Sequence, residues 1–329
     1  MHEGVNTMMS DIFFLSSEQI LTFMAFFAIG LLLSRRKLVP EDTGATLSKL
    51  VMYVFMPCMS FISFAQQCTP QKISGYLLAL IAGVALLLLL SVPVSALMRR
   101  CFPGNESEKL TASYSMISPN FGYIGFPFVL AMYGQEILSK YMMLGLPFTF
   151  YIYTVVMPKW MPAGTDRGWK ELLKHIFNPA TISVLLGIVW GLAGIPIPSF
   201  LNTICDSASG CVSVCAMILT GIVIGHISLK RALLEKRAYL VSAIRLLLLP
   251  AFFTIGVFFL CRWTGLDSTL LLIIGAFTAM PLGMNPVLFS EAYGRDGVFG
   301  AECAFISSLL SLLTLPLMFE LQALLSALL

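Results

Sequence analysis

One stretch of ten residues, lying inside an otherwise apolar segment, decides the fold of this chain: Ser118-Pro119-Asn120-Phe121-Gly122-Tyr123-Ile124-Gly125-Phe126-Pro127. Proline removes a backbone donor and clashes with the preceding turn, and glycine leaves the backbone uncovered, so this stretch should break a helix. In lipid, a broken backbone survives only where protein or a wet cavity satisfies its N–H and C=O groups. We therefore expect residues 118–127 to line a cavity inside a membrane protein.

A second stretch has the same character: Met280-Pro281-Leu282-Gly283-Met284-Asn285-Pro286. Two interrupted spans in corresponding places of two halves indicate the binding site of a transporter. The residues that follow also correspond, because Tyr133-Gly134 comes after the first break and Tyr293-Gly294 after the second. If each half contains five spans, which is an odd number, the second half enters the membrane from the opposite side. The pattern predicts an inverted repeat whose broken helices cross near the membrane midplane.

Composition places the whole chain in the membrane. Of its 329 residues, 58% are hydrophobic and 11% are charged, and the mean hydropathy is +0.88, far from the balance of a soluble domain. The net charge of +3 gives no reason to expect a nucleic acid partner. The eight cysteines are scattered without a CxxC pair, so we expect buried thiols, no metal site and no cofactor.

Ten apolar segments are long enough to cross a bilayer, which takes about 20 residues at 1.5 Å per residue. They lie at about 16–34, 46–66, 74–98, 110–134, 138–158, 178–196, 207–228, 238–261, 268–292 and 299–327. The sequence predicts an all-α membrane protein of ten transmembrane helices in a 5+5 inverted repeat, with spans four and nine broken. Its parts are a first repeat at 1–158, a cytoplasmic linker at 159–177 and a second repeat at 178–329.

The basic residues predict the orientation. Sixteen of the 20 lysines and arginines lie in or beside the connections after odd-numbered spans, whereas Lys72, Lys140 and Arg262 lie on the other side. Basic residues favour the cytoplasmic side of a membrane protein. We expect a multi-pass protein of the cytoplasmic membrane with both termini outside.

At the two breaks the chain resembles the auxin efflux carrier family, in its compact bacterial form. The matching stretches are Asn120 to Pro127, Phe177-Asn178-Pro179-Ala180 with Gly187, Gly194-Ile195 and Pro198, Arg245-Leu246 with Pro250, and Met280-Pro281 with Asn285 and Tyr293-Gly294. The resemblance implies the bile acid/sodium symporter-like fold. It also implies a scaffold at 12–66 and 178–229 and a moving transport domain at 73–158 and 236–329.

The resemblance further implies elevator-like alternating access by a secondary transporter of a small organic anion, such as a dicarboxylate or another weak organic acid. The sodium-coupled relatives place an acid at the ninth-span crossover, where this chain reads Met284-Asn285-Pro286. This difference favours H⁺ over Na⁺ as the coupling ion. The alternatives are a sodium-coupled bile-acid-type symporter and an anion channel of the same fold. The sequence leaves the oligomer open, with a homodimer among the options.

The expected substrate site comprises the residues of the two breaks and one buried cation: Ser118, Asn120, Gly122, Tyr123, Pro127, Arg245, Pro281, Gly283, Asn285 and Pro286. Asparagine offers two donors and an acceptor without a charge, so Asn120 and Asn285 are candidates to hold a carboxylate. Each could instead only cap its half-helix. Helix N-termini at a break attract anions in either case.

Four charged residues could support transport. Arg245 lies inside span eight and could attract the substrate, pair with Glu291 or Glu302, or extend to the headgroups. Glu291, Glu302 and, from the outer side, Asp206 are candidate proton carriers, because burial raises the pKa of a carboxyl group. The alternative for these acids is a solvated helix end.

No enzyme is expected, because the chain has no His-Glu-x-x-His, no Gly-x-Ser-x-Gly and no nucleotide-binding P-loop. A channel is less favoured than a carrier, since inverted broken helices suit one fixed site that is exposed alternately to the two sides.

Overall fold

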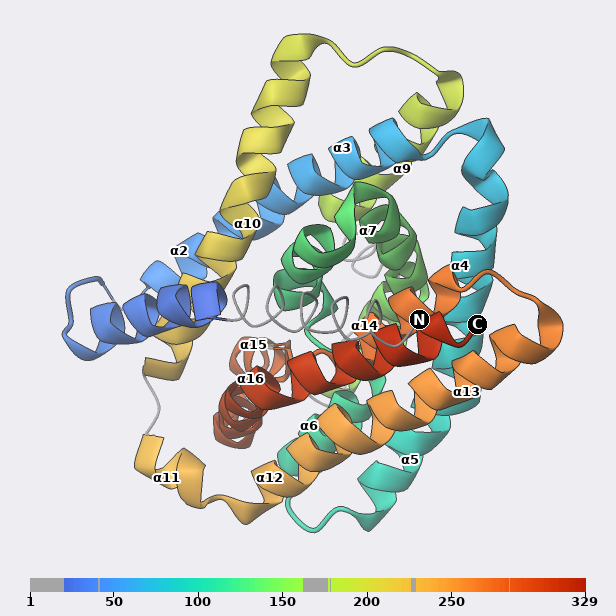
Figure 1. Ribbon diagram of the computed structural model, residues 1–329. Helices are drawn as coiled ribbons and strands as arrows, with labels where there is room; N and C mark the ends of the chain where they lie inside the picture. Colours follow the sequence, from blue (N-terminus) through green and yellow to red (C-terminus); the bar gives the residue numbers. More distant parts are fainter. Residues whose placement is uncertain (1–20, 41, 162–176, 178, 226–228, 284) are drawn as a thin grey trace.

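The computed structural model describes residues 21–329 except 41, 162–176, 178, 226–228 and 284. The chain is all-helical in this part (Figure 1). Six of the described helices are long and apolar enough to cross a membrane, and three apolar helices are shorter. The protein is therefore an all-α, multi-pass membrane protein, and the count of ten crossings stays a prediction.

The first half contains the helix Leu21–Arg35 and two long, continuous helical segments before the first break. Their elements are α2 (Thr43–Leu50), η1 (Val51–Phe55) and α3 (Met56–Gln67), followed by η2 (Pro70–Lys72), α4 (Ile73–Ala85), η3 (Leu86–Ser91) and α5 (Val92–Cys101). The broken span and the span after it comprise α6 (Glu106–Ile117), η4 (Phe121–Gly125), α7 (Phe126–Tyr151), η5 (Ile152–Val156) and η6 (Met157–Lys159).

The second half begins with α9 (Pro179–Ala193) and α10 (Ser199–Gly225). The short α11 (Leu229–Leu234) leads to the continuous segment of α12 (Lys236–Ala243), η7 (Ile244–Leu248) and α13 (Leu249–Thr264). The second broken span is α14 (Thr269–Ala279) with α15 (Asn285–Ala292), and α16 (Val298–Ala327) follows. The predicted start of span seven at residue 207 lies inside α10, which begins directly after Pro198 with turns that mix polar and apolar residues.

Five short segments are π-helical, and each is followed by a proline two residues after its end. They are η1, η3, η4, η5 and η7, with Pro57, Pro93, Pro127, Pro158 and Pro250. A proline cannot donate to the carbonyl four residues earlier, and its ring pushes that carbonyl away. A wider π-turn accommodates both effects without ending the helix. The prolines inside these spans therefore loosen the helices and leave them continuous.

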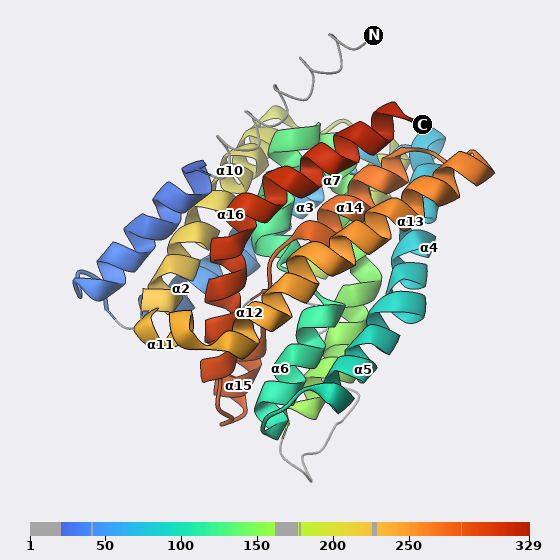
Figure 2. The same cartoon turned by 60° about the horizontal axis from the view of Figure 1, so that its bottom comes forward.

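The helices pack as two sets, which lie on different sides of the molecule in Figures 1 and 2. In the first set, α3 packs along α9 and α10, and α10 crosses the helix Leu21–Arg35 at Gly30 and Gly221. In the second set, α4 packs along α7, α5 along α6, α13 along α14, and α12 along α16. Small residues allow such close crossings in membranes. At Gly187 of α9, for example, an added Cβ would lie 2.7 Å from the carbonyl oxygen of Phe61.

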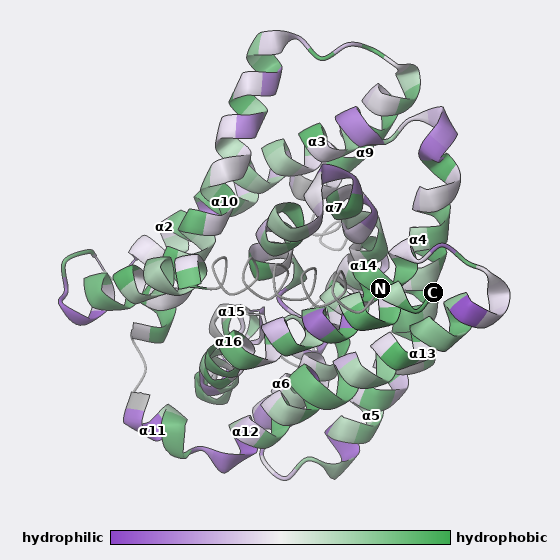
Figure 3. Cartoon of the chain, viewed as in Figure 1, coloured by the Kyte–Doolittle hydropathy of each residue, from purple (hydrophilic) through white to green (hydrophobic). Residues whose placement is uncertain are grey.

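The hydropathy of the residues differs between the helix surfaces and the helix ends. Apolar residues cover most of the helix surfaces, and hydrophilic residues gather at helix ends and connections (Figure 3). At one end, Arg237 pairs with Glu108 at 2.9 Å and with Glu235 at 2.9 Å, which joins the start of α6 to the start of α12. The Arg237 guanidinium lowers the pKa of the Glu235 carboxyl group through this hydrogen bond.

Both broken spans end at a glycine with positive φ. Gly134 divides α7 with a φ of 77°, and Gly294 follows α15 with a φ of 65°. Glycine adopts this region without the steric penalty of a side chain. The glycines of the two Tyr-Gly pairs that indicated the repeat therefore both adopt positive φ at the end of a broken span.

Candidate functional site

The two breaks lie against each other. Asn120 N–H donates to the carbonyl of Pro281 at 2.7 Å, and Pro119 and Leu282 form an isolated antiparallel bridge. Leu282 N–H donates to Ser307 Oγ of α16 at 3.1 Å. Protein groups thus satisfy backbone donors that the helix breaks have freed, as buried backbone requires. The antiparallel crossing has the direction that an inverted repeat requires.

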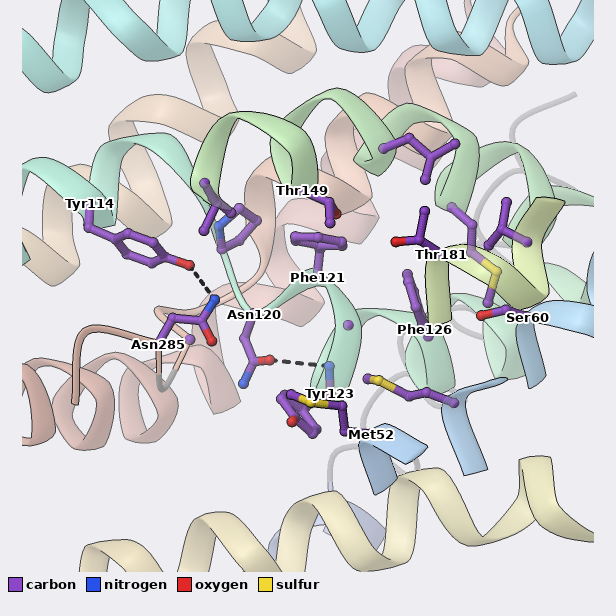
Figure 4. Close-up of a pocket in the computed structure, with 18 residues that line it drawn as sticks. Met52, Ser60, Tyr114, Asn120, Phe121, Tyr123, Phe126, Thr149, Thr181 and Asn285 are labelled. Atoms are coloured by element: carbon purple, nitrogen blue, oxygen red, sulfur yellow. Dashed lines mark hydrogen bonds between the residues drawn. The ribbon is translucent and has the colours of Figure 1, made fainter. Parts of the chain in front are cut away.

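A cavity of about 160 Å³ opens beside this crossing (Figure 4). The elements η1, α3, α6, η4, α7, η5, α9 and α15 contribute to its wall. Its apolar lining comprises Met52, Met56, Pro119, Phe121, Phe126, Met142, Leu146, Ile152 and Val184, and its other lining residues are Ser60, Tyr114, Asn120, Gly122, Tyr123, Thr149, Thr181, Gly283 and Asn285. None of these described residues carries a formal charge at neutral pH.

Asn120 has two functions in this geometry. It is 4% exposed, and its Oδ1 accepts from the N–H of Tyr123 at 3.2 Å as the N-cap of η4. Its Nδ2 group donates to no other described residue, and the side chain lines the cavity. The capping and binding interpretations are therefore compatible, because they use different atoms of one amide.

Asn285 begins α15 and faces the same cavity. Its Nδ2 donates to the hydroxyl of Tyr114 on α6 at 2.7 Å (Figure 4). Tyr114 is 1% exposed and also packs edge-on against Trp160 and Phe289. Tyrosine is common in the interfacial belts of membrane proteins, but this side chain lies inside the protein. The hydroxyl instead connects the first half of one broken span to the second half of the other.

The structure brings seven further predicted residues close to the crossing, in two ways. Gly122, Tyr123 and Gly283 line the cavity. The others support the backbone from behind and do not line it: Ser118 Oγ donates to the carbonyl of Pro119 at 3.3 Å, Pro281 accepts from Asn120, and Pro127 and Pro286 are buried at the starts of their half-helices.

Arg245 lies behind the second break and outside the cavity lining. It is 2% exposed, and it donates to the carbonyls of Met280 at 3.3 Å and Phe277 at 3.4 Å. Within a helix, the carbonyl of Phe277 would accept from residue 281, which is a proline and has no N–H. Arg245 therefore supplies the missing donor. Its positive charge also interacts favourably with the partial negative charge at the C-terminal end of α14. A side chain this deeply buried does not extend to the headgroups.

Glu302 and Asp206 do not line the cavity. Glu302 is 3% exposed, and its Oε1 lies 3.0 Å from Nε of Arg231 on α11, so its described ion pair is with Arg231 and not with Arg245. Asp206 accepts from Asn202 at 2.6 Å on an exposed part of α10. Glu291 belongs to α15, but its side chain lies outside the described residues.

The sequence did not identify the cavity residues of unbroken helices. Ser60 of α3, Thr149 of α7 and Thr181 of α9 add hydroxyl groups to the lining. A single serine or threonine in an apolar span is a weak signal, because such residues can bond their own helix backbone. Thr149 does so, donating to the carbonyl of Gly145 at 3.3 Å.

Comparison with known proteins agrees with this geometry. Residues 15–319 match the family described as "Membrane transport protein". An "uncharacterized transporter" of Methanothermobacter thermautotrophicus is 24% identical over 306 residues, which cover 93% of this chain and 98% of the relative. A second one, from Methanocaldococcus jannaschii, is 24% identical over 288 residues, which cover 85% and 90%. The chain therefore belongs to the membrane transport protein family, also called the auxin efflux carrier family, and is a transporter and not an enzyme.

Proposed function

We propose that the protein is a secondary carrier that moves a small organic anion by alternating access. The observation that carries this proposal is the cavity at the crossing of the two breaks, where the half-helices starting at Phe121 and Asn285 both begin. The first N–H groups of a helix have no intrahelical acceptor, and the helix dipole places partial positive charge there. Two such ends directed at one cavity favour a carboxylate.

The lining also restricts the chemistry of the anion. No described lining residue is Lys, Arg or His, so amides and helix ends must supply the recognition. Aliphatic and aromatic side chains form the larger part of the wall, which suits a weak organic acid with a short apolar body. The hydroxyls of Ser60, Thr149 and Thr181 offer polar partners for a second carboxylate, so a dicarboxylate also stays within the proposal.

The cavity volume argues against the bile-acid alternative. About 160 Å³ is close to the roughly 150 Å³ of an engineered cavity that binds benzene. It is below the roughly 300–1,000 Å³ of pockets for drug-sized ligands. A steroid-sized substrate would require a much larger site. For coupling we propose H⁺ in preference to Na⁺, because the ninth-span crossover carries Asn285 where the sodium-coupled relatives carry an acid.

The two helix sets support an elevator-like movement. We propose residues 12–66 and 178–229 as the scaffold and 73–158 and 236–329 as the transport domain, because the helices described in each group pack mainly with one another. Near the end of α3, Gln135 Nε2 donates to Ser63 Oγ at 2.7 Å across the two groups. The cavity itself extends to Thr181, close to the start of α9 at Pro179. Because the predicted orientation places the linker before α9 in the cytoplasm, we propose that this conformation exposes the site toward the cytoplasm.

Counterflow in proteoliposomes tests the proposal and separates a carrier from the channel alternative. Vesicles containing the protein are preloaded with unlabelled malate, succinate or benzoate, and entry of the same labelled acid is measured. A carrier is stimulated by its substrate on the opposite side, so at least one acid should accumulate transiently. Equal entry with and without preloading, at a rate that does not saturate, would indicate a channel and contradict the proposal.

A further inference from the structure

A second cavity lies away from the crossing of the two breaks. It has a volume of about 450 Å³ and is enclosed by α5, α6 and the end of the span that continues α7. Figure 2 shows α5 and α6 side by side at the lower right of the molecule. The cavity contains four cationic side chains, Arg99, Arg100, Lys109 and Lys159. We call it the basic cleft.

Basic residues at a membrane edge need no ligand by themselves, because orientation alone favours them there. The basic cleft differs in two respects. Its cations come from three separate elements and line one concave space. Within the described part of the chain, Glu106 is the sole carboxylate that pairs with any of them, through Arg99. Like charges gathered in a concave site raise the local concentration of anions.

The walls of the basic cleft are held in place by interactions among their own elements. Ser95 Oγ of α5 and Ser113 Oγ of α6 lie 2.7 Å apart in a hydrogen bond, and both side chains are buried. On the third side, Arg295 Nε donates to the carbonyl of Trp160 at 2.7 Å, and its Nη2 to the carbonyl of Lys159 at 3.4 Å. The cations therefore stand on a fixed frame, which lowers the entropy lost when an anion binds.

The surroundings of the cleft indicate the kind of anion. Leu89 of η3 is 71% exposed, Leu97 of α5 is 61% exposed, and Val155 of η5 is 40% exposed. They lie on the two continuous helical segments, η3–α5 and α7–η5, that also contribute Val92, Ala96 and Tyr151 to the lining of the cleft. A ligand that fits both parts has a phosphate at the membrane edge and an acyl chain against the apolar helix faces.

We propose that the basic cleft binds the phosphate group of an anionic phospholipid. Basic pockets between transmembrane helices are known to recognise such headgroups. A lipid phosphate is held at the membrane edge beside these cations, whereas a free phosphate ion makes no use of the apolar faces next to them. This proposal does not depend on the identity of the transported anion, because the basic cleft and the cavity at the crossing share no lining residue.

The test compares two purified variants with the same change in charge. The K109Q/K159Q variant removes two cations from the basic cleft. The K230Q/K236Q variant removes two exposed cations elsewhere, at the starts of α11 and α12. Binding of phosphatidylglycerol is titrated by native mass spectrometry, with phosphatidylcholine and inorganic phosphate as reference ligands. Each cation near an anionic lipid contributes roughly a fivefold gain in affinity, so two should contribute roughly thirtyfold.

We expect the cleft variant to bind phosphatidylglycerol roughly thirtyfold more weakly than the wild type, and K230Q/K236Q to bind it as well as the wild type. A third variant, K109R/K159R, keeps the charges and should keep the affinity, which separates a loss of charge from a damaged fold. Equal affinity in both glutamine variants would overturn the proposal. Phosphatidylcholine or inorganic phosphate binding as tightly as phosphatidylglycerol would overturn it too.

Discussion

Replacing Asn120 should weaken anion binding much more than it destabilises the fold. The contact between the two breaks uses the backbone N–H of Asn120, which donates to Pro281 at 2.7 Å and remains in any variant except proline. Asn120→Ala removes only the side-chain cap of η4, which accepts from Tyr123 at 3.2 Å. Loss of an N-cap costs about 1 kcal/mol. The crossing should therefore persist, and the variant should purify as a folded protein.

The loss in binding should be larger, because the Nδ2 group would donate to a charged carboxylate. Hydrogen bonds to charged groups contribute about 1.5–3 kcal/mol. At 1.4 kcal/mol per factor of ten, this range corresponds to roughly tenfold to 150-fold weaker binding. Uptake at a substrate concentration near the wild-type Kd should fall to about a fifth of the wild-type rate or less.

Asn120→Asp provides the matched control. The introduced carboxylate keeps the acceptor for Tyr123 and is stabilised by the positive end of the half-helix, but it loses the donor and repels an anion. Anion affinity should fall below that of Asn120→Ala at neutral pH. It should recover in part at low pH, because protonation restores a donor, whereas Asn120→Ala should show no such recovery. Isothermal titration and thermal unfolding in detergent measure the two quantities. Wild-type affinity in Asn120→Asp would refute the assignment and leave Asn120 as a cap alone.

Three further predictions concern the same framework. Asn285→Ala should abolish uptake in a folded protein. Tyr114→Phe should weaken anion binding by roughly threefold to tenfold, because it removes a neutral hydrogen bond worth about 0.5–1.5 kcal/mol. Wild-type uptake in both variants would exclude Asn285 and Tyr114 from the site. Arg245→Leu should weaken anion binding more than Arg245→Lys, since lysine keeps the charge behind the second break, and equal binding in the three proteins would limit Arg245 to a structural role. Gly294→Ala should lower the free energy of unfolding by about 1–2 kcal/mol because of its positive φ, while Gly256→Ala, in open space within α13, should not lower it; equal melting temperatures would contradict this reading.

The sequence predicted the features that follow from local backbone chemistry. Proline and glycine limit the conformations available to their own neighbours, so the two breaks and the turns at Gly134 and Gly294 could be placed without a tertiary structure. The contact between the two breaks was predicted from the inverted repeat, because two oppositely directed broken helices that cross near the midplane can satisfy each other's backbone groups. The family comparison confirmed the resemblance on which the transporter assignment depended.

Other features needed the tertiary structure. Pro281 shows from the sequence alone that the carbonyl of Phe277 lacks a donor, but nothing in the sequence indicates that Arg245, 32 residues earlier, supplies it. Tyrosine is a residue type that is common at membrane interfaces, whereas the hydrogen bond of Tyr114 depends on the position of Asn285 on a distant span. The apolar segment at 207–228 did not include the first turns of α10, because Ser199, Asn202 and Asp206 interrupt the apolar run there.

The most direct test of the central claim is to locate a bound acid. Crystals of the protein soaked with bromosuccinate or a bromobenzoate would reveal the bromine by its anomalous scattering and the carboxylate by the refined map. We predict a carboxylate within hydrogen-bond distance of Asn120 Nδ2, beside the first N–H groups of the half-helices that begin at Phe121 and Asn285, with the two breaks in contact. An acid bound elsewhere while this cavity stays empty, or two breaks that lie apart, would contradict the account.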